Sequence, residues 1–176
     1  MALPKVISIY RSLVSKERDR FGLFVRSPFH NTRNKIVVLM EHIEHITSTL
    51  SDEQELDIVW DKKAAHQKVF TGKKYNELQL NNLLSDLYQL LEKFLAWQTF
   101  EKNEEQQNVM VIENLMETSV MDNAGKLIKQ QTLQKNKDAI AGFKLHQLAD
   151  QYYFQRSRKG DNAYLLKGQE TLDIFY

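Results

Sequence analysis

Apolar residues recur along most of the chain at intervals of three and four positions, the spacing that places side chains on one face of an α-helix. Several of these segments begin with a polar residue and end near a glycine or a proline, as helices do. The pattern predicts helices over residues 3–14, 15–26, 31–50, 51–60, 61–70, 76–100, 109–121, 125–140, 143–158 and 163–176.

The most strongly patterned segment is the predicted helix over residues 76–100. A helix that is apolar over more than half of its circumference is buried between neighbouring elements. We therefore expect this segment to be the central helix of the first part of the chain. Its apolar stripe is Leu80, Leu84, Leu87, Leu91 and Phe94, flanked by Leu83, Leu90 and Trp97.

The neighbouring helices each supply a narrower apolar face. Ser15 is expected to cap the second helix, and Asn31 or Thr32 the third. Pro28 and Gly72 follow predicted helices and are expected to end them. The residues expected to face inward are Val6, Tyr10, Leu13, Val14, Phe21, Phe24, Val25, Ile36, Leu39, Met40, Ile43, Ile46, Leu50, Leu56, Val59 and Trp60.

Composition supports the helical prediction. The 176 residues include six glycines and two prolines, whereas folds rich in β-strands use both residues in frequent tight turns. The expected fold class is all-α, a multi-helix bundle with stacked helical hairpins that are repeat-like in the second half or follow no strict repeat. We expect an N-terminal helical bundle over residues 1–100, an acidic polar connection over 101–108, and a second helical layer over 109–176 packed on the first.

The composition also excludes several kinds of chemistry. Without cysteine the chain has no disulfide, thiol nucleophile or Cys-ligated metal. No segment approaches the roughly 18 apolar residues of a membrane span, and the N-terminus lacks the apolar core of a signal peptide. We therefore expect a soluble, cytoplasmic protein with no membrane partner and no cofactor.

Three short segments carry a resemblance to known proteins. They are residues 20–31, which contain RSPFHN, residues 72–95, which contain GKKYN and LNNLLSDL, and residues 170–176, ETLDIFY. These segments resemble the N-terminal region of a group of long, uncharacterised, helical bacterial proteins. The resemblance implies a helical protein with no assigned activity. Because those relatives continue further, it also implies either an N-terminal fragment or a short member of the group.

Histidines are the first place to seek catalytic or metal chemistry. His42 and His45 are three residues apart on a predicted helix, with Glu41 beside His45. Two such side chains could hold a metal if a third ligand came from elsewhere, but we expect them to form a solvated face. His66 and His146 are also expected on exposed faces. With no nucleophile motif and no phosphate-binding glycine loop, we expect neither an enzyme nor a metal site.

Charge is distributed in blocks along the chain. Residues 1–35 carry eight basic and two acidic residues, and residues 36–61 carry seven acidic residues and no lysine or arginine. Arginine together with aromatic residues is the usual composition of a binding hot spot. We therefore expect a non-enzymatic interaction or scaffold domain that binds another protein or the remainder of a longer chain. The candidate contact residues are Arg18, Arg20, Arg26, Phe29 and Arg33.

The alternative is a nucleic-acid-binding domain of the helix-turn-helix type. Residues 62–75 carry five lysines and no acid, and the helix that follows could present polar side chains to a major groove. Against this, the supposed recognition helix is rich in leucine and contains no arginine. We therefore expect nucleic acid not to be the partner. The residues of this alternative are Lys62, Lys63, Lys73, Lys74, Gln79 and Asn82.

Overall fold

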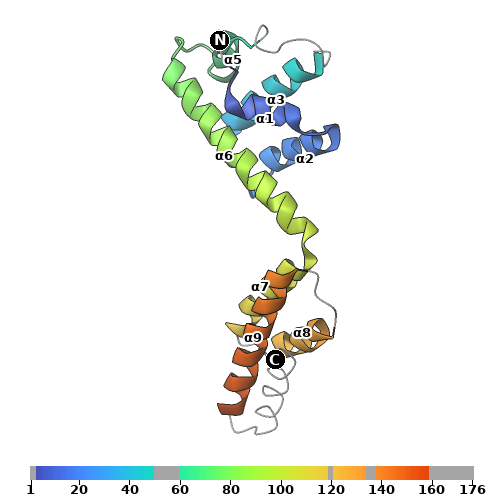
Figure 1. The fold of residues 1–176 in the computed structure, drawn as a ribbon. Helices are drawn as coiled ribbons and strands as arrows, with labels where there is room; N and C mark the ends of the chain where they lie inside the picture. Colours follow the sequence, from blue (N-terminus) through green and yellow to red (C-terminus); the bar gives the residue numbers. More distant parts are fainter. Residues whose placement is uncertain (1–2, 50–59, 119–120, 134–137, 159–176) are drawn as a thin grey trace. The chain divides into compact units, whose positions relative to one another are not determined.

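The computed structural model describes residues 3–49, 60–118, 121–133 and 138–158 of the chain. Over these residues it contains eight helices and no strand, which confirms the all-α prediction (Figure 1). The chain divides into two compact units, Met1–Trp97 and Gln98–Tyr176, which we call unit 1 and unit 2 and describe separately. None of the described helices combines the length and apolar character needed to cross a bilayer.

The described residues of unit 1 form the long helix α6 and four shorter helices. Figure 1 shows the first three helices along one side of α6, with α5 near the start of α6. The helices are α1 (Lys5–Ser12), α2 (Ser15–Arg26), α3 (Asn34–Thr49), α5 (Lys62–Val69) and α6 (Glu77–Lys102), of which unit 1 includes residues 77–97.

The core of unit 1 lies along the apolar stripe of α6, as the sequence predicts. Three aromatic rings connect α1, α2 and α6: the ring centroid of Phe21 is 6.1 Å from that of Tyr10 and 5.3 Å from that of Phe94. Phe24 meets Phe94 edge-on at 5.6 Å. The stripe residues Leu80, Leu83, Leu84, Leu87, Leu90, Leu91 and Phe94 are all buried.

Two residues predicted to face inward are exposed instead. Val14 is 63% exposed because α1 ends at Ser12, and Val14 is an extended residue before α2 whose backbone N–H donates to Glu17 Oε2 (3.4 Å). Trp97 is 44% exposed. The stripe steps by four and three residues, so its next inward position after Phe94 is 98, and Gln98 is buried.

Helix α2 begins at Ser15 itself, so the prediction that Ser15 caps it is wrong, and the preceding residue, Val14, makes no side-chain cap hydrogen bond. Helices α5 and α6 begin at side chains that accept hydrogen bonds from free backbone N–H groups. Asp61 Oδ1 accepts from Lys63 N (2.8 Å) at the start of α5, and Asn76 Oδ1 accepts from Gln79 N (3.1 Å) at the start of α6. Gly72, the predicted stop after α5, has a φ of +75°, a conformation that favours glycine. Leu50, Leu56, Val59 and the predicted helices over 51–60 and 163–176 lie outside the described residues, apart from Trp60, which is buried.

The described residues after α6 form three helices around a separate core. They are α7 (Glu104–Met116), α8 (Met121–Thr132) and α9 (Ala139–Arg158). The predicted helix over residues 125–140 is wrong, because α8 ends at Thr132 and α9 begins at Ala139. Asp138 caps α9, since its Oδ1 accepts from Ile140 N at 2.9 Å. Helix α6 ends at Lys102 and α7 begins at Glu104. The polar stretch 101–108, predicted to be a connection, is therefore helical except at Asn103.

The buried stripe of α6 gives a direct stability prediction. Leu87 is completely buried, so Leu87→Ala should lower the free energy of unfolding by about 2–5 kcal/mol through lost burial and a new cavity. Urea denaturation followed by circular dichroism measures the change. Gln89→Ala, at an exposed position of the same helix, should change stability by less than about 0.5 kcal/mol. Equal effects of the two substitutions would contradict the placement of this face in the core.

A close approach in unit 2 gives a second prediction. A Cβ at Gly125 would meet the ring of Tyr152, with Cε1 at 2.8 Å and Cζ and Oη closer still. Gly125→Ala should therefore destabilise unit 2 by about 1–3 kcal/mol, although alanine favours the helix by up to about 1 kcal/mol. In a Tyr152→Leu background the same substitution should be neutral or stabilising. Thermal unfolding of the four proteins tests this, and an equal effect in both backgrounds would contradict it.

Candidate functional site

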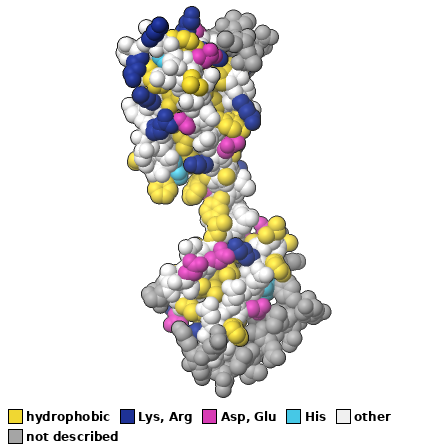
Figure 2. Space-filling model, turned by 90° about the vertical axis from the view of Figure 1, so that its left-hand side faces the viewer, with side chains coloured by type: hydrophobic (Ala, Val, Ile, Leu, Met, Phe, Trp, Pro, Cys, Tyr) yellow, Lys and Arg dark blue, Asp and Glu magenta, His cyan; other side chains and the backbone are white. Residues whose placement is uncertain are grey.

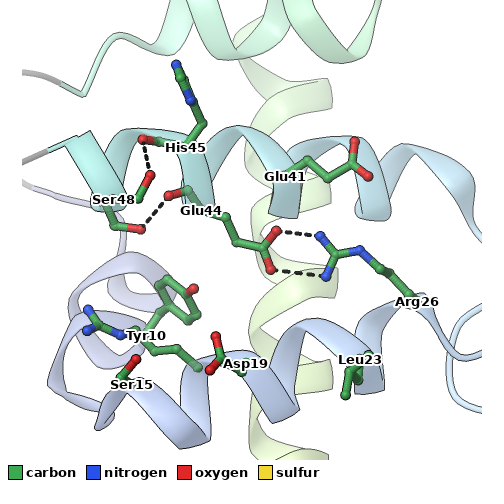
Figure 3. Close-up of a pocket in the computed structure, with 11 residues that line it drawn as sticks. Tyr10, Ser15, Asp19, Leu23, Arg26, Glu41, Glu44, His45 and Ser48 are labelled. Atoms are coloured by element: carbon green, nitrogen blue, oxygen red, sulfur yellow. Dashed lines mark hydrogen bonds and ion pairs between the residues drawn. The ribbon is translucent and has the colours of Figure 1, made fainter.

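Unit 1 carries a groove of about 680 Å³ lined by side chains of α1, α2 and α3 (Figure 3). One side supplies Arg18 and Arg26 from α2, and the other supplies Glu41, Glu44 and His45 from α3. The groove therefore contains charges of both signs.

An ion pair joins the two sides of this groove. Arg26 Nη1 donates to Glu44 Oε1 (3.1 Å), and Arg26 Nη2 contacts Glu44 Oε2, so the pair is bidentate (Figure 3). A Cβ at Gly22 would lie 2.5 Å from Glu44 Oε1 and 2.6 Å from Arg26 Nη1. The absence of a side chain at Gly22 therefore leaves room for the pair. Arg26, a predicted contact residue, is held by an acid of its own chain.

A tight turn at residues 27–33 forms a second feature. The backbone N–H groups of His30 and Asn31 donate to Ser27 O at 3.1 and 2.9 Å. Asn31 Nδ2 donates to Val25 O (2.9 Å), and Asn31 Oδ1 accepts from Arg33 N (2.9 Å). The side chain of Asn31, predicted to be a possible helix cap, instead ties this turn to the end of α2. Helix α3 begins at Asn34.

The turn presents aromatic side chains. The His30 ring stacks on the buried Phe24 ring at 3.7 Å, meets Phe29 edge-on at 5.0 Å, and lies 6.2 Å from the Trp97 ring. Phe29 is 88% exposed. We call Phe29, His30 and Trp97 the aromatic patch. In this patch the Phe29 ring is exposed, the His30 ring packs on a core residue, and the Trp97 indole is partly buried.

The predicted contact residues lie in two places. Arg18 and Arg26 line the groove, whereas Phe29 and Arg33 belong to the turn, where Arg33 pairs with Asp86 of α6. Arg20 is half-buried on α2. Sequence reasoning placed Trp97 in the core and so missed it as a surface residue. The spacing of the α6 stripe could have identified Trp97 as a surface residue, because its steps of four and three residues lead to position 98 rather than 97.

The predictions for three histidines require correction. His42 is half-buried beside Trp60, with ring centroids 6.1 Å apart, and so does not belong to a solvated face with the exposed His45. His66, predicted to be exposed, is 1% exposed: its Nε2 accepts from Asn76 N (3.2 Å), and its ring stacks on Phe70. His146 is half-buried rather than exposed. In the part of the chain that the structure describes, no three histidine or acidic side chains gather as metal ligands.

The residues of the nucleic-acid alternative surround α5 and the start of α6. Figure 2 shows basic side chains gathered over the upper left of unit 1. Lys62 Nζ pairs with Glu77 Oε1 (2.6 Å). Residues 70–76 separate α5 from α6, a longer connection than the three- to four-residue turn of a helix-turn-helix. Lys63, Lys73, Lys74, Gln79 and Asn82 are exposed.

Comparison of the chain with models of protein families, with curated proteins and with solved structures gave no match. The resemblance of the three sequence segments to long bacterial proteins therefore stays a prediction.

The environment of His42 predicts a pH dependence of stability. Burial lowers the pKa of His42 below its ordinary value of 6.5, and the nearby Lys68 lowers it further. The unfolded chain therefore binds a proton at this histidine more readily than the folded chain. The free energy of unfolding should therefore decrease as the pH falls below about 6.5, where His42 of the unfolded chain takes up a proton. The decrease should end once the pH lies below the pKa of His42 in the folded chain.

The test compares urea denaturation of three proteins at pH 7.5 and pH 5. His42→Phe should lose less stability on acidification than the unaltered chain. His45→Gln, at an exposed position of the same helix, removes a lesser cause of the lowered pKa of His42 and should reduce the loss only slightly. A response to acid that His42→Phe leaves unchanged would show that other groups determine it.

Proposed function

We propose that the protein is a non-enzymatic interaction domain that binds another protein, or a further part of a longer chain, through the aromatic patch. We also propose that it acts in the cytoplasm. The observation that carries the proposal is the 88% exposure of Phe29 on a turn held by hydrogen bonds. A large apolar ring in this position gains free energy when a partner covers it.

The construction of the turn favours binding. Asn31 fixes the backbone on both sides of Phe29, and His30 rests on the buried Phe24 ring. Because the turn is already ordered, association loses little conformational entropy there. Aromatic residues that are positioned in this way are typical hot spots of protein interfaces.

The nucleic-acid alternative receives weaker support. The exposed lysines Lys63, Lys73 and Lys74 favour contact with phosphates. Helix α6, however, buries its leucine face in unit 1, and Glu77 pairs with Lys62 at its first turn. The side chains left for reading bases are Gln79 and Asn82, without an arginine.

Photo-crosslinking tests the proposed interface. A photoreactive phenylalanine analogue at position 29 should form adducts with a protein of the native host after irradiation. The matched control carries the same analogue at Leu78, which is 68% exposed on α6. Excess unlabelled protein should suppress the adduct at position 29, whereas excess Phe29→Ala should not. Equal adducts at both positions, or equal competition by Phe29→Ala, would contradict a role for the turn.

Binding to duplex DNA provides the prediction for the alternative. If the lysines around α5 are only a solvated surface, the dissociation constant at about 150 mM salt should be no tighter than the ~10⁻⁴–10⁻⁶ M of non-specific contact. Fluorescence anisotropy with labelled duplexes of several sequences measures this. Nanomolar binding that prefers one sequence, and that Asn82→Ala abolishes without lowering stability, would establish the alternative instead.

A further inference from the structure

A small hollow lies beside the aromatic patch. It has a volume of about 180 Å³ and lies between the turn with the start of α3 and one face of α6. His30 and Arg33 line it from the turn, and Asp86, Gln89 and Lys93 line it from α6. His30 belongs to both features, so the hollow and the aromatic patch form a continuous surface.

The register of α6 explains why these residues meet. Asp86, Lys93 and Trp97 are separated by seven and four residues, so they lie along one face of the helix. The turn follows the same face, because Arg33 pairs with Asp86 and the His30 ring lies near the Trp97 ring. Lys93 therefore lies between the ion pair and the exposed aromatic residues.

The charges of this surface are not balanced. Arg33 and Asp86 neutralise one another, whereas Lys93 is exposed and pairs with no acid among the described residues. The positions three and four residues away on α6 are Gln89, Leu90, Ala96 and Trp97, none of which is acidic. Within the described part of the chain, Lys93 is thus a cation with no acidic partner, directly beside the exposed aromatic rings.

We propose that this surface binds a protein segment in which an aspartate or glutamate lies next to a large apolar side chain. The carboxylate pairs with Lys93 above the hollow, and the apolar side chain packs against Phe29 and Trp97. This inference rests on the proposed function and adds the chemistry of the partner. A charge-assisted hydrogen bond beside covered aromatic rings provides orientation as well as affinity.

Single-stranded nucleic acid is the alternative ligand for a surface of aromatic rings and cations, because bases stack on such rings. The local charges favour the acidic protein segment. Arg33 is already neutralised by Asp86, so it is not available to neutralise a phosphate. A single unpaired lysine matches one carboxylate better than a run of phosphates.

Selection from a library of random nine-residue peptides, displayed on phage, tests the proposal with the full chain as the target. The chain is used unaltered and as Lys93→Glu, Lys63→Glu and Phe29→Ala. Lys63 is the matched control because it is exposed at the start of α5 and is absent from the lining of the hollow. Circular dichroism should show unchanged helix content in all four. Affinities of synthetic copies of the enriched peptides are then measured by fluorescence anisotropy.

The unaltered chain and Lys63→Glu should enrich peptides in which an acid adjoins an aromatic or aliphatic residue. Lys93→Glu should lose this preference or replace the acid by lysine or arginine, and it should bind the acidic peptides about threefold to tenfold more weakly. An acidic preference that persists in Lys93→Glu would overturn the assignment of the carboxylate site.

Further outcomes separate this inference from the proposed function. If enriched peptides show no acidic preference but lose binding to Phe29→Ala, the partner chemistry is wrong and the aromatic interface stands. If no peptide is enriched on any form of the chain, both proposals fail. If a labelled twelve-residue oligothymidylate binds more tightly than every selected peptide and depends on Phe29 and Lys93, the surface takes single-stranded nucleic acid and both proposals are wrong.

Discussion

The burial of one face of α6 is the interaction on which the rest of unit 1 depends, because α1 and α5, which pack in the same core, are too short to be stable alone. Helices α1 and α5 have eight residues each, whereas isolated helices shorter than about 12–15 residues are marginal in water. Each large apolar side chain that is removed from water contributes about 1.5–3 kcal/mol. Phe21 and Phe94, whose ring centroids are 5.3 Å apart, show how α2 gains this stabilisation from α6. The short helices and the long one therefore stabilise each other.

The aromatic patch is held in place by its contacts with that core. Phe24 packs against Phe94 on one side and supports the His30 ring on the other. Hydrogen bonds of Asn31 close the turn, so Phe29 is held out from the surface by a backbone that has little freedom to fold inward. An exposed ring on a loose loop could cover itself against a neighbouring apolar surface. A ring on this ordered turn stays exposed, which is the observation on which the proposed interface rests.

Much of the fold could be predicted from sequence because helix period and helix caps are local properties. The α6 stripe and the wide apolar face of α3 needed no more than residue spacing. The predictions are wrong where contacts between residues distant in sequence determine burial or where a helix ends. His66 lies between Ala65 and Gln67 in a segment rich in lysine, yet it is buried, and the backbone N–H of Asn76, ten residues later, donates to it. The helix predicted over 125–140 is wrong because α8 ends at Thr132 and Asp138, whose Oδ1 accepts from the backbone N–H groups of Ile140 and Ala141, starts a new helix.

The candidate site was predictable in its residue types but not in its arrangement. The sequence marks basic and aromatic residues near the N-terminus, but their pairing depends on acids that are distant along the chain. Arg26 meets Glu44, and Arg33 meets Asp86 of α6. Exposed ion pairs of this kind contribute at most about 1 kcal/mol to stability, but they decide which charges remain for recognition. Two predicted contact arginines are already neutralised, so the proposed selection of a partner beside Phe29 relies on the charge of Lys93, a residue that composition and spacing gave no reason to choose.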